Sequence, residues 1–394
     1  MSHDQPQAWR TVTIEDLGQV VTGRTPPSSK PEMFGSEYPF ITPSDMSFGL
    51  RRVTTERSIS LVGSLALGRI KLPPKSVAFV CIGATIGKVC LTFEDSFTNQ
   101  QINSIVVDCD RHSPEFVYYL MLGMVDKVKA LAGGAATPIV NKSSFCGISV
   151  SIPPIETQSK IAFILSAYDD LIENNTRRIE ILEEMARRLY EEWFVQFRFP
   201  GHEGVEFTDS SLGLIPVGWT VGCLQDVITL QRGFDLPVQH RLAGSVPIIS
   251  ATGIGGSHVE AKVKGPGVVT GRSGSIGKVM YVHDDHWPLN TTLWGANYPL
   301  GSTLFAYYVL SSIDLKGFNV GAAVPTLNRN DIHGLPVNIP PKEIVQSFEK
   351  VAEPLHNLTE KLRRKNANLR AQRDLLLPKL ISGEIDVSDI PMPT

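Results

Sequence analysis

The sequence is poor in cysteine, and it has no long apolar run. Its five cysteines include no CxxC pair, which argues against a disulfide framework and against a cysteine-rich zinc site. No run of about eighteen apolar residues is present, and the N-terminus MSHDQPQAWR lacks the basic start and apolar segment of a signal peptide. We therefore expect a folded chain in the cytoplasm that does not contact a membrane.

Strong net charge is also missing. The formal net charge is −3, so no basic field covers the whole molecule, and a surface that binds nucleic acid must be a local patch. The composition, with 42% apolar and 20% charged residues, is that of an ordinary globular protein. A length of 394 residues is enough for two domains.

Catalytic motifs are incomplete. In CIGATIGKV, Gly83 precedes Gly87 by four positions where a phosphate loop needs five, and Val89 stands where Ser or Thr would bind magnesium. GRSGSIGKV at 271–279 fails the same test, so we expect these glycines to form tight turns. No methyl-donor loop and no Ser-His-Asp arrangement can be singled out.

Two further patterns also favour ordinary structure over chemistry. Glu260-Ala-Lys262 has the Glu-x-Lys form of some nucleases, but the chain has no Pro-Asp pair, and a solvated charge pair is expected. The segment HDDH at 283–286 has the spacing of metal ligands, yet its composition is typical of a loop. We predict no catalytic residue, no metal site and no bound cofactor.

The chain contains an internal repeat. Residues 134–156 (GAATPIVNKSSFCGISVSIPPIE) and 321–343 (GAAVPTLNRNDIHGLPVNIPPKE) align without gaps and are identical at 11 of 23 positions. Upstream, ATIGKV at 84–89 matches GSIGKV at 274–279, and the wider spacing of earlier matches gives the first copy roughly twenty extra residues. Because a solenoid unit has only about 20 to 50 residues, this period indicates two domain-sized copies, each of α+β type.

A long helix is expected after each copy. In each IPPxE segment the prolines and the glutamate predict a strand that ends and a helix that begins. Gly201 and Gly383 are expected to end the two helices. Apolar residues at alternating spacings of four and three predict a coiled-coil seam in the first helix at Ile161, Leu165, Tyr168, Ile172, Asn175, Ile179, Leu182, Ala186, Leu189 and Trp193. In the second helix the seam is weaker, at Phe348, Val351, Leu355, Leu358, Leu362, Lys365, Leu369, Gln372 and Leu376.

Each helix is the simplest partner for the other. An antiparallel pair would relate the two copies by a pseudo-twofold axis and act as a rod of roughly 57 Å between them. The alternative is that each helix packs into a separate domain core. Asn175 and Lys365 within the seam would set its register. The predicted parts are a domain over 1–155, a helix over 156–199, a domain over 200–341 and a helix with tail over 342–394.

Two related but different domains, held at a fixed separation by a rod, suit a DNA target that is split into two half-sites. Dimeric repressors match half-site spacing in the same way. A rod of that length covers no more than about 17 base pairs.

Several long segments resemble one known family. LSAYDDLIENNTRRIEILEEMARRLYEEWFVQFRFPGHE at 165–203 closely resembles the central conserved region of type I restriction-modification specificity subunits. Their C-terminal conserved region resembles residues 366–385 (NANLRAQRDLLLPKLISGEI). Sequence segments of their recognition domains are similar to residues 39–46 (PFITPSDM) and 96–105 (SFTNQQINSI). The resemblance covers essentially the whole chain.

This resemblance implies a noncatalytic subunit with two target recognition domains, each reading half of a split DNA sequence. It implies that the helices dock two methyltransferase subunits and that restriction subunits can join. S-adenosylmethionine, ATP and magnesium would then belong to those partners. A different class of function stays open, namely a structural adaptor that assembles methyltransferase-like subunits without reading sequence. A self-sufficient nuclease is a more distant alternative.

Base reading needs polar or basic side chains on exposed loops. The candidates in the first copy are Thr42, Ser44, Asp45, Arg51, Arg52, Lys88, Asn99, Gln100, Gln101 and Thr137. Those in the second copy are Arg232, Arg272, Ser273, Lys278, Asn290, Thr291, Thr292, Thr326 and Asn328. Asn141 and Asn328 are equivalent in the repeat, and both are alternatively turn or cap residues.

Aromatic residues crowd the end of the first helix. Trp193, Phe194, Phe197 and Phe199 are more than a two-helix seam needs, so an exposed anchor for a partner subunit is one interpretation. Packing onto the second recognition domain is the other.

Overall fold

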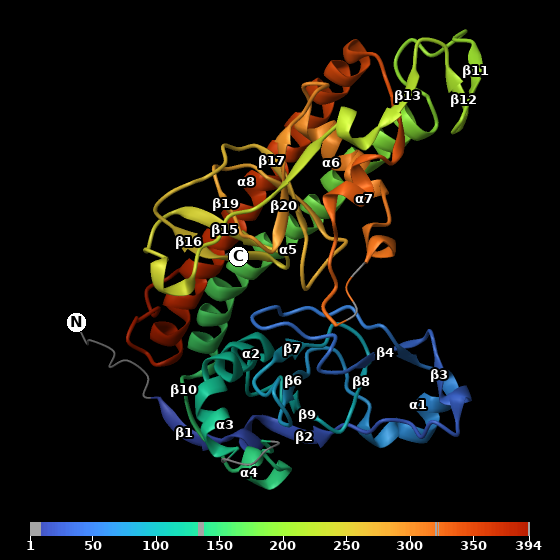
Figure 1. The fold of residues 1–394 in the computed structure, drawn as a ribbon. Coiled ribbons are helices and arrows are strands. Elements are labelled where there is room, and N and C mark those ends of the chain that lie inside the picture. The colour runs from blue at the N-terminus through green and yellow to red at the C-terminus, as the bar shows by residue number, and fades with distance from the viewer. Residues whose placement is uncertain (1–8, 133–137, 320, 322, 393–394) are drawn as a thin grey trace. The chain divides into compact units, whose positions relative to one another are not determined.

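The computed structural model describes residues 9–132, 138–319, 321 and 323–392. The chain forms two compact units (Figure 1). Unit 1 comprises residues 1–175 and 365–394, and unit 2 comprises residues 176–364. Each unit therefore holds one copy of the repeat together with parts of both long helices.

Unit 1 is built on two four-stranded sheets and a terminal strand pair. The first sheet is antiparallel, in the order β2 (Gly18–Thr22), β9 (Ile102–Val107), β6 (Val77–Val80) and β7 (Val89–Leu91). The second has the order β3 (Phe34–Gly35), β5 (Ser58–Ile59), β4 (Tyr38–Ile41) and β8 (Phe97–Thr98), and β4 and β8 are parallel. β1 (Arg10–Thr13) pairs with β10 (Ser149–Ile152). The helices of this copy are α1 (Leu61–Leu67), α2 (Pro114–Gly123), α3 (Val125–Leu131) and α4 (Lys142–Cys146).

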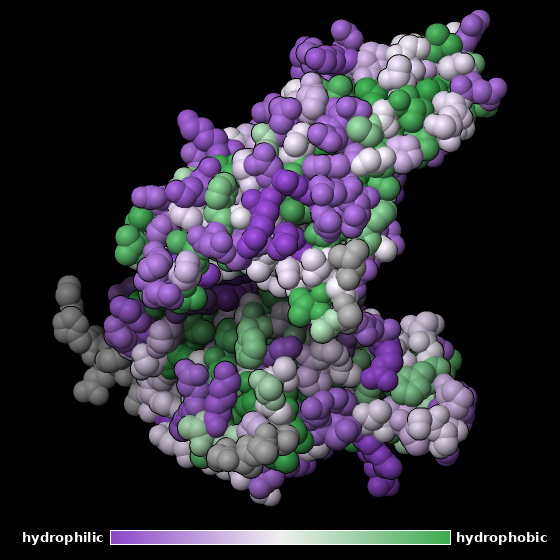
Figure 2. All heavy atoms as spheres, viewed as in Figure 1, coloured by the Kyte–Doolittle hydropathy of each residue, from purple (hydrophilic) through white to green (hydrophobic). Residues whose placement is uncertain are grey.

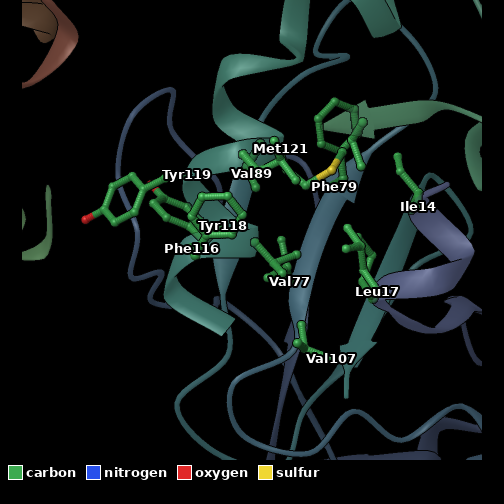
Figure 3. Packing of buried hydrophobic residues seen from close by; sticks show 14 of the residues in the cluster. Ile14, Leu17, Val77, Phe79, Val89, Val107, Phe116, Tyr118, Tyr119 and Met121 are labelled. Carbon is green, nitrogen blue, oxygen red and sulfur yellow. The ribbon is translucent and has the colours of Figure 1, made fainter. Parts of the chain in front are cut away.

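The core of unit 1 lies between the first sheet and α2. Figure 3 shows Val77, Phe79 and Val89 from the sheet beside Phe116, Tyr118 and Met121 from the helix. The ring of Tyr119 points away from this cluster, so its hydroxyl is free to reach a polar partner. β6 is buried along its whole length, as expected for a central strand covered on both faces.

Unit 2 repeats this plan. Its four-stranded sheet has the order β14 (Thr229–Arg232), β20 (Thr292–Asn297), β17 (Gly267–Gly271) and β18 (Val279–Val282). A second sheet has the order β16 (Gly253–His258), β15 (Val246–Ser250) and β19 (Trp287–Pro288), and β15 and β19 are parallel. β13 (Thr220–Cys223) pairs with β21 (Pro336–Ile339), and the helices are α6 (Thr303–Ser312) and α7 (Arg329–His333).

The two topologies confirm the duplication predicted from sequence. β2, β9, β6 and β7 correspond to β14, β20, β17 and β18 in order, and the parallel pair β4–β8 corresponds to β15–β19. Asn141 and Asn328 are both helix N-caps, whose side chains accept hydrogen bonds from the nitrogens of Ser144 and Asn330. The cap interpretation of these two asparagines is therefore confirmed.

A hairpin of β11 (Phe207–Ser210) and β12 (Gly213–Pro216) has no counterpart among the described residues of unit 1. Phe207, Leu212 and Leu214 on it are exposed. Hydrophobic residues gather at the place of this hairpin in Figure 2.

The long helices are α5 (Ile155–Tyr190) and α8 (Lys342–Ile381). Each follows a strand and a proline, as the IPPxE segments predict. Gly383 follows the end of α8 with a φ of 78°, which glycine adopts most easily. The expectation for Gly201 was wrong. The α-helix α5 ends at Tyr190 and continues as a π-helical turn over Glu191–Val195, and Phe197 takes the left-handed conformation instead.

No helix among the described residues is long and apolar enough to cross a membrane.

Candidate functional site

Within each unit, the parts of α5 and α8 run antiparallel. In unit 1, Asp169 bonds Arg373 and, further along α5, Asn175 bonds Asn366, so rising numbers on one helix meet falling numbers on the other. In unit 2, Glu183 pairs with Arg363, and Trp193 packs on Phe348. The predicted antiparallel pairing is confirmed in both.

The α5 seam lies where the sequence predicts it. Ile161, Leu165, Ile172, Asn175 and Ile179 are buried, as are Ala186 and Trp193. Tyr168, Leu182 and Leu189 are half-buried.

The prediction of the seam residues in α8 was only half correct. Phe348 and Leu362 are buried and Leu355, Leu369 and Leu376 are half-buried, but Val351 is 48% and Leu358 37% exposed. Lys365 and Gln372 are exposed as well. The alternate positions lie one residue later, at Ala352, Thr359, Asn366 and Arg373, all of which are buried. An apolar pattern misses them because three of the four side chains are polar.

Two asparagines meet in this seam. The Asn175 Nδ2 donates to Asn366 Oδ1 at 2.9 Å, and the Asn366 Nδ2 donates to the carbonyl of Ile172 at 3.2 Å. A buried asparagine in a coiled-coil seam costs stability but disfavours every register that leaves it unpaired. Asn175 is thus buried in the seam with Asn366 as its partner, whereas Lys365, the other residue expected to set the register, is exposed.

A buried ion pair lies two turns from these asparagines. Arg373 and Asp169 have side chains that are 3% and 4% exposed, and the guanidinium bonds the Asp169 carboxylate. The Tyr119 hydroxyl donates to the second carboxylate oxygen at 2.7 Å, and Arg373 also donates to the carbonyl of Gly49 at 2.9 Å. The recognition domain and both helices are therefore joined within unit 1 by one polar network.

Arg51 belongs to the same region. Its side chain is 8% exposed and lies 2.5 Å from Asp170 and 3.2 Å from Glu173, both on α5. Burial lowers the pKa of Arg51, but the hydrogen bond to Asp170 and the charge of Glu173 outweigh this effect and raise it. The guanidinium is bound to α5, so it is not accessible to DNA here. The neighbouring Arg52 is exposed and lies 3.8 Å above the ring of Phe93.

The aromatic cluster at the end of α5 packs inside unit 2. Trp193, Phe194 and Phe199 are buried in its core, and the centroid of Phe194 lies 4.7 Å from that of Phe305. Phe197 is half-buried, and its ring lies 5.2 Å from Trp219. The interpretation of these residues as an exposed partner anchor was wrong, because the second recognition domain covers them.

In unit 1 the structure brings most candidate readers together around three loops. Lys88, in the turn between β6 and β7, donates to the carbonyl of Pro43 at 2.7 Å. Asn99 donates its backbone nitrogen to Ile41, and Gln101 accepts from the nitrogen of Cys81. These contacts join the loops after β4, β6 and β8 into one polar surface, which we call loop cluster 1 (Thr42, Ser44, Asp45, Lys88, Asn99, Gln100 and Gln101).

Unit 2 forms the matching loop cluster 2, which comprises Arg232, Arg272, Ser273, Lys278, Asn290, Thr291 and Thr326. The nitrogens of Arg272 and Ser273 donate to the carbonyl of Thr291, and Ser273 bridges to Thr326. Lys278, the counterpart of Lys88, donates to the carbonyl of Thr252 at 3.0 Å. Both lysines thus hold the loop that follows the equivalent strand, β4 or β15.

The candidates differ in how accessible they are. The exposed candidates include Ser44, Gln100, Arg232 and Lys278. Three others are buried and form local hydrogen bonds, namely Thr42, Asn99 and Thr292. Thr137 lies outside the described residues. Two residues that sequence reasoning missed support the readers: Thr25 donates to Gln100 at 2.7 Å, and Asp235 binds Asn290 and lies 3.9 Å from Arg232. No sequence signal marks them beyond their position in polar loops.

The incomplete catalytic motifs are structural. Gly83, Gly87, Gly274 and Gly277 all have φ between 86° and 94°, so they form turns as expected. Glu260 and Lys262 form the expected exposed charge pair at 3.9 Å.

The segment at 283–286 is engaged in local contacts. His286 bonds the carbonyl of Asp284, and the Asp284 side chain binds Arg364. Over residues 9–132, 138–319, 321 and 323–392, no group of three or more His, Cys, Asp or Glu side chains is placed to hold a metal ion.

A duplicated α+β chain, in which each copy is joined to parts of an antiparallel helix pair, is the class of protein that these units define. The chain belongs to the type I restriction modification DNA specificity family, whose sequence model matches residues 6–184 and 216–370. It is a specificity subunit with two repeated target recognition domains.

Individual relatives agree with this assignment. The MjaIX specificity subunit of Methanocaldococcus jannaschii is 29% identical over 420 aligned residues, covering 98% of this chain and 95% of that protein. The HindI specificity subunit of Haemophilus influenzae is 36% identical over 194 residues, covering 47% of this chain and 41% of that one. A crystal structure of a type I S subunit from M. genitalium has the same fold, with a TM-score of 0.64, 16% identity and coverage of 96% and 98%.

Proposed function

We propose that each recognition domain reads one half of a split DNA sequence and that the helix pair fixes the distance between the halves. The observation that carries this proposal is the duplication itself. Two units with the same strand order present matching loop clusters, but the polar side chains in those clusters differ. Equivalent surfaces with different side chains suit two half-sites of different sequence.

The exposed side chains of the clusters are of the right chemical kind. Arginine binds guanine through two hydrogen bonds and glutamine binds adenine in the same way, each giving about 1–3 kcal/mol of discrimination. Gln100 of loop cluster 1 and Arg232 of loop cluster 2 are exposed, and each has a neighbour that orients it. Lys88, Lys278 and Arg52 supply positive charge for backbone phosphates without giving the whole chain a basic charge.

The helix pair acts as a ruler in this proposal. Its register is set by the Asn175–Asn366 pair and by the buried Asp169–Arg373 pair, both of which resist slippage. The same helices dock two methyltransferase subunits, which bring S-adenosylmethionine. Restriction subunits that use ATP and magnesium can join the assembly. This chain contributes recognition and geometry, and its partners contribute the chemistry.

A binding experiment separates this function from that of an adaptor. The chain, co-purified with its cognate methyltransferase subunit, is offered a randomised duplex pool at physiological salt, and the bound sequences are determined. We expect Gln100→Ala to relax one half-site and Arg232→Ala to relax the other, each by a factor of about 5 to 150. Lys264→Ala, which removes an exposed charge from a loop of unit 2 outside the cluster, should leave both half-sites unchanged.

An adaptor would enrich no sequence. It would also show the same salt-dependent binding to every duplex.

A further inference from the structure

The internal repeat allows the helix contacts of the two units to be compared position by position. Residues of α8 align with residues of α5 that lie 187 positions earlier, so His356 corresponds to Asp169 and Arg373 corresponds to Ala186. Tyr308 of α6 corresponds to Tyr119 of α2, since each is the last residue of the aligned segments FVYY and FAYY. The Tyr119, Asp169 and Arg373 group of unit 1 is therefore replaced in unit 2 by Tyr308, His356 and Ala186.

In unit 1 this place is filled by arginines of the chain itself. Arg373 enters from α8 and bonds Asp169, whose carboxylate also accepts from Tyr119. Arg51 and Arg52 enter from the loop after β4, bind Glu173 and lie 5.8 Å and 3.8 Å from the centre of the Phe93 ring. Acidic and aromatic side chains thus enclose guanidinium groups.

In unit 2 the same place is a cavity of about 1090 Å³. Two sequence differences open it. Ala186 has no side chain beyond Cβ where Arg373 has a guanidinium, and the segment between β15 and β17 (251–266) is much shorter than the segment between β4 and β6 (42–76) that carries Arg51 and Arg52. Unit 2 therefore lacks the arginine side chains and the longer segment that fill the equivalent place in unit 1.

The walls of the cavity suit a flat cation. The ring centroids of Tyr281, Tyr307, Tyr308 and His283 lie between 5.2 and 6.5 Å from that of His356. His283 corresponds to Phe93, which holds the arginines in unit 1. Arginine stacks on such rings while its N–H groups bond acceptors. The charged residues that line the cavity are Glu180, Glu183, Glu184, Glu191 and Glu192, together with Arg187, Arg198, Arg363 and Lys278.

The cations that line the cavity have partners of their own. Arg187 pairs with Glu184 and Glu191, Arg198 pairs with Glu192, and Lys278 donates to the carbonyl of Thr252. Burial, together with the charges of His283 and Arg363, lowers the pKa of His356 to about 4, so its ring is neutral near pH 7 and bonds the Tyr308 hydroxyl at 2.8 Å. Arg363 lies at the rim, half exposed and paired with Glu183. Neither closes the cavity as Arg373 closes the equivalent place.

We propose that the cavity of unit 2 receives an arginine side chain of a methyltransferase subunit, in the place that the chain fills with its own arginines in unit 1. The source of the arginine rests on the proposed function, whereas the binding of a guanidinium does not. The two halves of the helix pair are then unequal docking sites, one closed by the chain itself and one completed by a partner.

A small probe tests the cavity without any partner. The full chain with isotope-labelled histidine is titrated with N-acetyl-arginine amide, and the imidazole signals of His283 and His356 are followed by NMR and assigned from His283→Gln and His356→Gln. We expect both signals to move with a dissociation constant on the order of 1–10 mM, and N-acetyl-lysine amide to bind at least several-fold more weakly. Unmoved signals, or equal binding of the two amides, would overturn the proposal.

Two variants rebuild the arrangement of unit 1 and keep His283 as the reporter. His356→Asp supplies the carboxylate found at Asp169 and should tighten binding of the arginine probe about tenfold. Ala186→Arg with His356→Asp supplies both members of the unit 1 pair, fills the cavity and should abolish probe binding. Met185→Arg places the same charge on the exposed face of α5 and should change nothing.

Docking of the methyltransferase subunit identifies the source of the arginine. Co-purification of the wild-type chain with that subunit is measured first, and its failure would contradict the proposed function and the source while leaving the probe result intact. If the wild type docks, Ala186→Arg with His356→Asp should weaken binding of one of two methyltransferase subunits by at least tenfold, and Met185→Arg should not. Normal docking of the filled variant would overturn the assignment of the cavity to that partner.

Discussion

Removal of Arg373 is expected to damage unit 1 more than any surface substitution on the same helix. Arg373→Met keeps the aliphatic stem and removes the guanidinium, which leaves the Asp169 carboxylate buried with Tyr119 as its strong remaining partner. It also removes the bond to the Gly49 carbonyl. Loss of one partner of a buried ion pair costs about 3–5 kcal/mol, because the other charge stays desolvated and unpaired.

The double variant Asp169→Leu with Arg373→Met should be less destabilised than either single variant. It removes both charges and fills much of the same volume with apolar groups, which is often close to neutral for a buried pair. The Tyr119 hydroxyl then retains only Ser166, at 3.5 Å, and this limits the recovery. We expect a coupling free energy of at least about 2 kcal/mol between the two positions.

Hydrogen exchange of the full chain, read by mass spectrometry, measures this locally. Amides of α8 between 366 and 380 report on unit 1, and amides of α5 between 179 and 190 serve as the internal reference in unit 2. Lys365→Met is the matched control, since it removes an exposed cation from the same helix. A loss below about 1 kcal/mol for Arg373→Met, or strictly additive single variants, would refute the reasoning.

Three further outcomes are expected. Ala352→Lys should lower the free energy of unfolding by more than about 3 kcal/mol, because it buries a charge in the unit 2 core. Val351→Lys, on the exposed face of the same helix, should change it by no more than about 0.5 kcal/mol. Equal losses in thermal unfolding would contradict the seam positions given above for α8. Burial, with a smaller effect of Glu353, raises the pKa of Glu349 from 4.5 to about 7, so between these values the folded state holds a proton that the unfolded chain has lost. Stability should therefore fall as the pH rises through this window, by about 1–2 kcal/mol after discounting for solvent screening, and Glu349→Gln should abolish that slope in unfolding curves at pH 5 and pH 8. Gly87→Ala should destabilise the protein more than Gly201→Ala, because a Cβ at Gly87 would lie 2.4 Å from Val125. At Gly201 only the strain of a positive φ applies, which costs about 1 kcal/mol. Denaturant midpoints of the two variants measure the difference, and equal losses of stability would count against the close approach at Gly87.

The duplication and the long helices could be predicted because they leave strong signals in the sequence. An ungapped alignment of 23 residues with 11 identities marks the repeat, and alternating spacings of four and three mark the seam of α5. In α8 the same rule placed Phe348 and Leu362 correctly, yet it chose Val351 over Ala352 and Leu358 over Thr359, since hydrophobicity was its only criterion. Seam positions held by polar pairs need the partner helix before they can be recognised.

The roles of individual polar and aromatic residues were harder to predict. Arg51 is a candidate for DNA contact from sequence, but in the structure it is buried and bonded to two acidic residues about 120 positions later in the chain. Trp193 and Phe194 are covered by α6 and α8, whose contacts with the end of α5 depend on the tertiary fold. In each case the deciding neighbour is distant along the chain.

The central claim is that the two recognition domains read two half-sites at a fixed spacing. The most direct test is to co-express the chain with its cognate methyltransferase subunit and to map methylated adenines in the host genome by single-molecule sequencing. A single split motif, with two short half-sites and a constant gap, is the predicted result. Complexes that form but leave no motif methylated would contradict it and favour an adaptor.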